Sequence, residues 1–257
     1  MKLITSRDNA LYKEIKHLAT SSQARRKLAS TILDGVHLCS GYVENRGQPT
    51  WCVVNEMSQH HPEIAQLLAR TEHQIILSDA LYQSLSQVEN GVGIFFVVPI
   101  PNITAPAVIS QTAVMLENLQ DPGNLGSVLR SAAAAGIKQV FCSDGTVSAW
   151  SPKVLRAGMG AHFVLEIIEN CDLPSMLNAS NLTVLATSSH ADKTIYECEL
   201  SRDVIWLFGH EGQGISDALM VHATEKVSIP HLGKIESLNV AASAAICFFE
   251  QVRQRTA

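Results

Sequence analysis

The sequence predicts a two-domain α/β protein, on three observations. Short apolar segments alternate with amphipathic segments along the 257 residues, as strands alternate with helices in this fold class. Hydrophobic residues make up 46% of the chain and charged residues 17%, enough apolar material for a sizeable core. Three prolines within residues 99–106 interrupt the alternation, a spacing that no helix tolerates. We therefore place a linker at residues 99–107, between domains of residues 1–98 and 108–257.

In the amino-terminal domain, the first thirty residues show helical spacing and contain a basic run at residues 21–27. The expected strands that follow cover residues 30–33, 51–54, 74–77 and 93–98. The expected helices cover residues 34–42, 62–70 and 79–85, the last with Asp79 placed to cap it.

The carboxyl-terminal domain has strands and helices in regular alternation. Strands are expected at residues 113–116, 139–142, 163–168, 183–186, 204–208 and 226–229. Helices are expected at residues 124–136, 152–157, 173–179, 216–222 and 238–253. Short strands interleaved with helices predict a mostly parallel sheet that is covered on both faces.

Composition and charge exclude several classes of protein. High apolar and low charged content exclude disorder, a collagen-like repeat and a coiled coil. The longest apolar stretch is far too short for a membrane span and the first residues lack a signal-peptide core, so we expect a cytoplasmic protein. Six widely spaced cysteines without a C-x-x-C pair predict neither disulfides nor a bound metal.

The net charge of −5 is unevenly distributed. Residues 1–50 carry 8 basic and 4 acidic side chains, whereas residues 51–257 carry 11 and 20. Such an asymmetry can mark an electrostatic binding surface at one end of the molecule.

The first segment with chemical potential covers residues 116–131. A strand leads into a glycine-containing turn, and a helix follows with Asn124 near its start and Arg130 and Ser131 about two turns later. Ligands of open parallel sheets bind at the carboxyl ends of strands, which favours a site here. The alternative is an ordinary helix start, with Asp121 as cap and Arg130 as a surface charge.

The second segment, residues 206–216, is an apolar strand followed by a loop with Gly209, Gly212 and Gly214 around Glu211. The order G-x-x-G-x-G differs from the dinucleotide fingerprint, so a phosphate loop is a poor interpretation. Glycines let the backbone approach a ligand, and Glu211 could neutralise a cationic group. A flexible strand-to-helix turn is the alternative.

The third segment, residues 227–246, contains a strand that ends at Pro230, a loop and a helix of small residues. Ser237 suits the helix cap, and Asn239 would lie in the first turn with its amide outward. Taken alone, this segment would be interpreted as a capped core helix.

Together the three segments resemble, in order and spacing, the signature motifs of the SpoU/TrmH family of RNA ribose 2′-O-methyltransferases. The resemblance covers roughly residues 113–250. The matching residues are Asn124, Gly126, Arg130 and Ser131 in the first motif, Gly209, Glu211 and Gly214 in the second, and Ile229, Pro230, Gly233, Ser237, Leu238 and Asn239 in the third. Residues 151–161 also resemble a Pro-Lys-x-x-Arg run of the family, although Gly158, Ala241 and the pair His231-Leu232 depart from common family residues.

The resemblance implies a homodimeric enzyme that uses S-adenosylmethionine. It implies an α/β methyltransferase domain with a trefoil knot, after a small α/β RNA-recognition domain resembling a ribosomal protein. The catalytic residues it implies are Asn124, Arg130, Glu211, Ser237 and Asn239. The cofactor-binding residues it implies are Thr187, Ser188, Gly209, Glu211, Gly212, Ile229 and Leu238. Ribosomal RNA of the 23S type is the expected substrate, with tRNA as the alternative.

Physical chemistry limits the role of Arg130. A guanidinium stays protonated far above neutral pH, so it is a poor base. We expect Arg130 to hold a phosphate and polarise the ribose hydroxyl, whose proton leaves to water or phosphate.

Contacts to RNA phosphates are expected from basic side chains in two places. These residues are Arg25, Arg26 and Lys27, together with Lys153 and Arg156. A solvated charged turn is the alternative for the first group. At the level of function, a catalytically silent RNA-binding or ribosome-assembly factor is the competing hypothesis, while an oxidoreductase is disfavoured because no G-x-G-x-x-G follows a strand.

Overall fold

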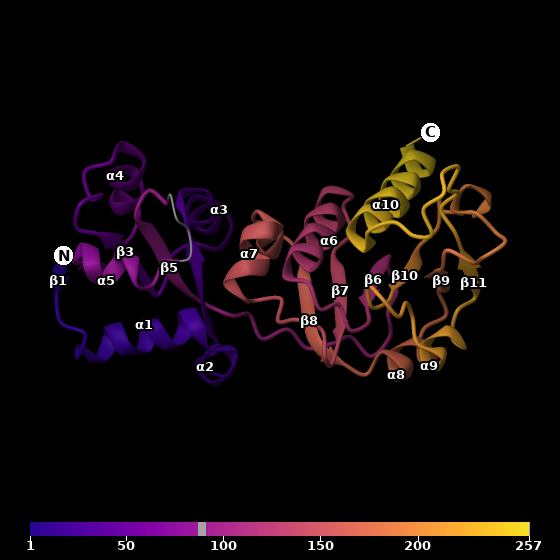
Figure 1. Cartoon of the computed structure of the whole chain (residues 1–257), viewed down its shortest axis with the longest axis horizontal. Coiled ribbons are helices and arrows are strands. Elements are labelled where there is room, and N and C mark those ends of the chain that lie inside the picture. The colour runs from indigo at the N-terminus through magenta and orange to yellow at the C-terminus, as the bar shows by residue number, and fades with distance from the viewer. Residues whose placement is uncertain (87–90, 257) are drawn as a thin grey trace. The chain divides into compact units, whose positions relative to one another are not determined.

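The computed structural model describes residues 1–86 and 91–256 and divides the chain into two compact units (Figure 1). Unit 1 comprises Met1–Asn102 and Trp150–Phe163, and unit 2 comprises Ile103–Ala149 and Val164–Ala257. Each unit is a sheet with helices on both faces, so the predicted α/β class is confirmed.

Unit 1 contains a five-stranded sheet of order β1-β4-β3-β5-β2. Its strands are β1 (Lys2–Ile4), β2 (Ser30–Asp34), β3 (Trp51–Asn55), β4 (Gln74–Leu77) and β5 (Ile94–Pro99). Its helices are α1 (Ala10–Thr20), α2 (Ser22–Leu28), α3 (Val36–Arg46), α4 (Pro62–Ala69), α5 (Asp79–Gln83) and α7 (Pro152–Gly158), with a short 3₁₀ turn at Ala161–Phe163. Strands β1, β3 and β4 are parallel, whereas β5 runs antiparallel to β3 and β2.

The amino-terminal segment differs from the expected continuous helix. Lys2–Ile4 pairs with β4 as a strand, and α1 begins only where the Asn9 side chain accepts hydrogen bonds from the backbone N–H groups of Leu11 and Tyr12. The basic run then forms its own helix, α2, because Ser21 caps its start and Ala29 ends it in the left-handed conformation. The cap of α5 is also corrected, since Ser78 rather than Asp79 occupies the N-cap position.

Unit 2 contains a six-stranded, fully parallel sheet of order β11-β9-β10-β6-β7-β8. Its strands are β6 (Ala113–Leu116), β7 (Gln139–Ser143), β8 (Glu166–Cys171), β9 (Thr183–Thr187), β10 (Val204–Phe208) and β11 (Glu225–Val227). Its helices are α6 (Pro122–Ala134), α8 (Leu173–Asn178), α9 (Asp217–Met220) and α10 (Val240–Thr256), with a 3₁₀ turn at Ile195–Glu197.

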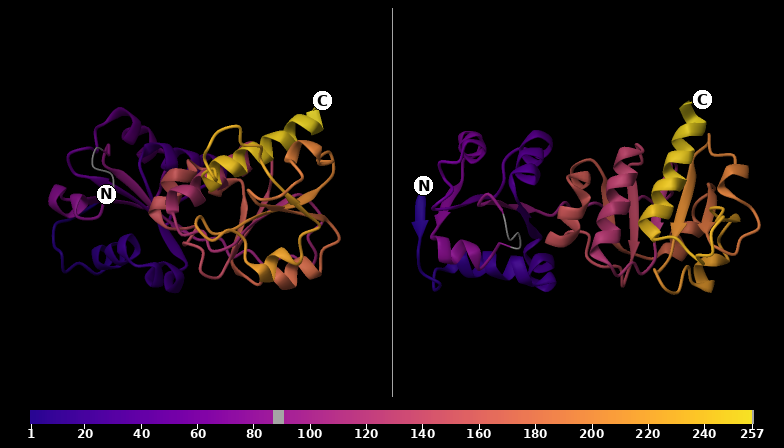
Figure 2. Two further views of the ribbon diagram at one scale, coloured as in Figure 1. Left: turned by 45° about the vertical axis from the view of Figure 1, so that its right-hand side comes forward. Right: turned by 45° about the horizontal axis from the view of Figure 1, so that its top comes forward.

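The helices of unit 2 cover both faces of its sheet, as predicted. Helices α6 and α10 lie on one face and α8 and α9 on the other (Figures 1 and 2). Because successive strand residues point to opposite faces, Trp206 and Phe208 pack against Phe248 of α10, while Leu207 lies in the core beneath α8 and α9. Parallel pairing brings the carboxyl ends of β6, β9 and β10 to one edge of the sheet.

The two central strands are also fixed to each other at their amino ends. The Asp203 carboxylate, just before β10, accepts hydrogen bonds from the backbone N and the hydroxyl of Thr112, just before β6, at 3.0 and 2.7 Å. Arg255 donates to the same carboxylate oxygen at 2.9 Å.

No helix among the described residues is both long and apolar enough to cross a bilayer. Within the same residues, no group of three or more His, Cys, Asp or Glu side chains could hold a metal ion. The six cysteines are free thiols, and burial raises the pKa of Cys247 to about 12.

Candidate active site

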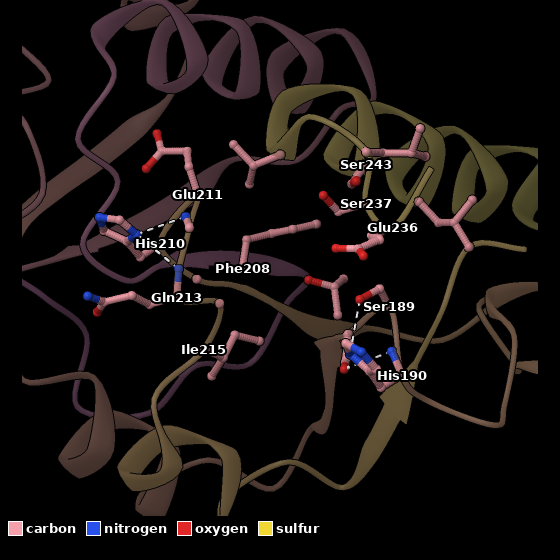
Figure 3. A pocket seen from close by; sticks show the side chains of 18 of the residues that line it. Ser189, His190, Phe208, His210, Glu211, Gln213, Ile215, Glu236, Ser237 and Ser243 are labelled. Carbon is pink, nitrogen blue, oxygen red and sulfur yellow. Dashed lines mark hydrogen bonds between the residues drawn. The ribbon is translucent and has the colours of Figure 1, made fainter. Parts of the chain in front are cut away.

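A cavity of about 670 Å³ lies at the carboxyl edge of the parallel sheet (Figure 3). It is lined by the segments that follow β9, β10 and β11 and by the start of α10. Its volume is in the range of sites for small molecules and cofactors. All seven predicted cofactor-binding residues line it: Thr187, Ser188, Gly209, Glu211, Gly212, Ile229 and Leu238.

The loop after β10 forms one wall of the cavity. Gly214 N donates to His210 O at 2.8 Å and His210 N donates to Gly214 O at 3.0 Å, which closes the loop on itself. A Cβ on Gly209 would overlap the backbone of Gly214, so only glycine fits at that position. Nδ1 of His210 accepts from the backbone N of Gly212 and of Gln213. Figure 3 shows this loop facing Glu236, Ser237 and Ser243 across the cavity.

Glu211 joins this loop to the start of α6. Its carboxylate accepts hydrogen bonds from Gln120 N at 3.2 Å, Asp121 N at 3.1 Å and Asn124 Nδ2 at 3.1 Å. Partial burial raises the pKa of Glu211, but the hydrogen bonds that it accepts outweigh burial and hold the pKa below its ordinary value of 4.5. The side chain is therefore a carboxylate at neutral pH.

Asn239 joins the third segment to the first. Its Nδ2 donates to Oδ1 of Asn124 at 2.8 Å, while its Oδ1 accepts from the backbone N of Ala241 and of Ala242 at 2.9 and 3.3 Å. Asn239 therefore caps α10, and the expectation that Ser237 is the cap is wrong. The helix begins two residues later than predicted, so Ser237 belongs to the loop and lines the cavity.

Three of the predicted catalytic residues thus form one hydrogen-bonded chain, Asn239–Asn124–Glu211, which connects all three motif segments. Arg130 is exposed on α6, six residues, or nearly two turns, after Asn124. Among the described residues its guanidinium has no hydrogen-bond or ion-pair partner, which leaves it available to a substrate.

The predicted RNA-contacting residues all belong to unit 1. Arg26, Lys27 and Lys153 are exposed. Arg25 is buried and donates from Nη1 to Leu18 O at 2.8 Å, so the expectation that it contacts RNA is corrected to a role in joining α2 to α1. Nη1 of Arg156 is buried without a hydrogen-bond partner in the described part of the chain.

Sequence analysis missed two acidic residues. Glu236 lines the cavity next to Ser237, and it puts a second carboxyl group beside the space that Glu211 borders. Glu117 directly follows β6 and is 9% exposed. In the sequence, the only sign of a role for Glu117 is that a charged residue directly follows four apolar ones.

The arrangement suits a cationic ligand that is held largely by backbone. Three glycines and two acidic side chains line the cavity. A hydroxylated polyanion could then approach from the side of α6, where Arg130 is exposed.

Comparisons with known proteins agree with this description. The model of the SpoU rRNA Methylase family matches residues 111–249. An uncharacterized tRNA/rRNA methyltransferase of Synechocystis sp. is 31% identical, with 99% of this chain and 94% of the relative covered. The 23S rRNA (guanosine(2553)-2′-O)-methyltransferase RlmP of Bacillus subtilis is 29% identical, with 97% and 98% covered. The structure of an AdoMet-bound rRNA methyltransferase from Sinorhizobium meliloti superposes with a TM-score of 0.83 at 25% identity, with 98% of this chain and 97% of that chain covered.

Proposed function

The chain belongs to the SpoU rRNA methylase family, and from that premise we propose that it transfers a methyl group from S-adenosylmethionine to a ribose 2′-hydroxyl of 23S-type ribosomal RNA. The observation that carries the proposal is the Asn239–Asn124–Glu211 chain at the edge of the cavity. It brings residues of all three family motifs together in one site. Such a substrate lies in the cytoplasm, where we propose that the protein acts.

The cavity fits S-adenosylmethionine in size and in chemistry. This donor supplies an electrophilic methyl group on a cationic sulfur. The loop of residues 209–215, which we call the glycine loop, offers backbone groups for the polar edges of the donor. The carboxylates of Glu211 and Glu236 lower the cost of bringing a cation out of water. Thr187, Ser188, Ile229 and Leu238 complete the walls.

The chain's own residues would position the ribose rather than remove a proton by strong base catalysis. Arg130 would hold a phosphate and polarise the hydroxyl, since a guanidinium does not accept protons near neutral pH. Asn124 and Asn239 would fix the position of α6 and hence of Arg130. Ser237 faces the cavity and would contact the ribose or the donor. Proton loss would go to water or to an RNA phosphate.

RNA recognition is assigned to the amino-terminal domain, which we place at residues 1–98, with a linker at residues 99–107 and the methyltransferase domain at residues 108–257. Within that last range, Trp150–Phe163 belongs to unit 1 of the structure. The absence of helix or strand between residues 100 and 112 supports the linker. The exposed cations Arg26 and Lys27 support the RNA role. Lys153, which is exposed, and Arg156, which is partly exposed, would add phosphate contacts. The α/β architecture of this region is compatible with a fold like that of a small ribosomal protein.

A trefoil knot and a homodimer also form part of the proposal. The segment after β11 is hydrogen-bonded to the loop after β9 through Ser228, whose N donates to Lys193 O and whose O accepts from Ile195 N; this close approach of the two segments supports the knot. Leu232, Ile235 and Phe249 are exposed on the carboxyl-terminal segment. A second copy of the chain would cover these side chains, because apolar groups gain free energy on leaving water.

The proposal is tested with purified protein, labelled S-adenosylmethionine and unmodified transcripts of 23S rRNA and tRNA. Digestion and mass spectrometry should find a 2′-O-methyl nucleoside in the 23S transcript only. Label in tRNA alone would refute the ribosomal substrate. Absence of transfer to either RNA, with S-adenosylhomocysteine still bound, would instead favour a catalytically silent RNA-binding factor.

A further inference from the structure

We propose that Glu117 is a positioning residue for the methyl donor: its carboxylate holds the far end of the glycine loop through Ser216 and thereby sets the shape of the donor cavity. This inference rests on the proposed function of the cavity. It adds a residue that lies outside the cavity lining.

Glu117 forms hydrogen bonds at both ends of the glycine loop. Its backbone N donates to Phe208 O at 2.9 Å, where the loop begins. Its carboxylate accepts from the backbone N of Ser216 at 2.8 Å and from the Ser216 hydroxyl at 2.6 Å, where the loop ends. One residue of β6's carboxyl end therefore fixes both ends of residues 209–215.

The position of Ser216 decides where two cavity-lining side chains lie. Ile215 precedes it directly, and Met220 follows on α9, whose N-cap is Ser216. Met220 N also donates to Ser216 O at 2.8 Å. If Ser216 loses its hydrogen bonds to Glu117, Ile215 and Met220 are no longer held in position against β6. The wall of the cavity that these two side chains form can then move.

The middle of the loop has a separate anchor. Glu211 attaches it to the start of α6, whereas Glu117 attaches its ends to β6. Because Glu117 is 9% exposed, water competes poorly for its hydrogen bonds, and truncation would leave the Ser216 N–H without its acceptor.

A second carboxylate in the same sheet accepts the same pair of hydrogen bonds and serves as a control for Glu117. At the opposite ends of the same two strands, Asp203 accepts from the backbone N and hydroxyl of Thr112, which is the same donor pair that Glu117 accepts from Ser216. Asp203 is remote from the cavity lining. Loss of the Asp203 carboxylate frees the start of β6 from the start of β10, whereas loss of the Glu117 carboxylate frees the end of the glycine loop from β6.

The test compares wild type, Glu117→Ala, Glu117→Gln, Ser216→Ala and Asp203→Ala in the full-length protein. Calorimetry with S-adenosylhomocysteine gives the Kd, thermal unfolding gives Tm, and steady-state methyl transfer gives KM for the donor and for RNA. Glu117→Ala should raise Kd and donor KM at least tenfold with RNA KM within twofold. Glu117→Gln should stay within threefold of wild type, because its amide can accept from Ser216 N and donate to the hydroxyl.

Asp203→Ala should lower Tm, because it removes the hydrogen bonds from Thr112 and from Arg255, and should leave Kd within twofold of wild type. If Glu117→Ala does not fold, Ser216→Ala decides the question, with an expected rise in Kd of threefold or more. The proposal is overturned if the truncations at positions 117 and 216 leave Kd within twofold, or if Asp203→Ala weakens binding equally. A wild-type protein that binds no S-adenosylhomocysteine overturns the proposed function, and the role of Glu117 with it.

Discussion

Asn239 performs two tasks that substitution can separate. Its Oδ1 caps α10, and its Nδ2 donates to Asn124 at the edge of the cavity. Alanine removes both interactions. Aspartate keeps an acceptor for the cap, and a negative charge is favourable at a helix amino terminus, but it cannot donate to Asn124.

The stability effects follow from these contacts. Loss of the cap costs about 1 kcal/mol, and loss of an exposed amide hydrogen bond costs about 0.5–1 kcal/mol. Asn239→Ala should therefore lower Tm by roughly 3–8 °C, whereas Asn239→Asp should stay within about 2 °C of wild type. Both should reduce kcat/KM for RNA by about 100-fold, because misplacement of Asn124 misaligns α6 and Arg130.

The assay pairs thermal unfolding with methyl transfer to RNA, and Asn9→Ala is the control. Asn9 caps α1 through the same two backbone positions, with Oδ1 accepting from Leu11 N and Tyr12 N at 3.0 and 3.2 Å, so its loss should lower Tm without lowering kcat. An Asn239→Asp protein with wild-type activity would refute the catalytic role of the Asn239–Asn124 hydrogen bond.

Three further predictions concern the carboxylate, the arginine and the cations. Since hydrogen bonds hold the pKa of Glu211 below 4.5, its anchoring of the loop is complete above that pH and is lost only as pH falls through the lowered pKa. Affinity for S-adenosylhomocysteine should thus be constant from pH 8 to about 5, and a decline that begins near pH 6 would contradict this. Arg130→Ala should lower kcat by at least about 100-fold with Tm unchanged, because the exposed side chain has no partner among the described residues; a Tm loss would indicate a structural role. Lys27→Ala should reduce the salt dependence of RNA binding, d log K/d log[salt], by about 1. Lys138→Ala, an exposed cation of unit 2, should not.

Local patterns predicted most strands well because their signal is contained in the strand itself. Residues 204–208 are apolar at every position and are all buried as β10, and β4 coincides with the predicted residues 74–77. Strand β1 escaped prediction because its three residues become a strand only by pairing with β4, more than seventy positions away. No local pattern carries that pairing.

The site was predicted as a set of residues but not as a network. Glycine spacing and family motifs pointed to the lining of the cavity, yet neither specifies which side chain caps α10. Ser237 and Asn239 are both good caps by residue type. The choice depends on the distance between α10 and α6, because only a helix that starts at Val240 brings the residue before it to Asn124. Glu117 was missed for the same reason, since its partner Ser216 lies on a different strand's loop.

The direction of the hydrogen bonds explains why the chain uses asparagine at both positions 124 and 239. Oδ1 of Asn239 is occupied by two backbone N–H groups of α10, so only Nδ2 is left to face Asn124. Asn124 must then present Oδ1 to it and Nδ2 to Glu211, whose ionised carboxylate can only accept. A helix cap on α10 thus fixes the amide orientation at α6 and supplies a donor to the carboxylate of the glycine loop. Aspartate at position 124 would place an acceptor against Glu211 and break the link from the glycine loop to α10, while Glu211 would keep its hydrogen bonds from the backbone N of Gln120 and of Asp121 at the start of α6.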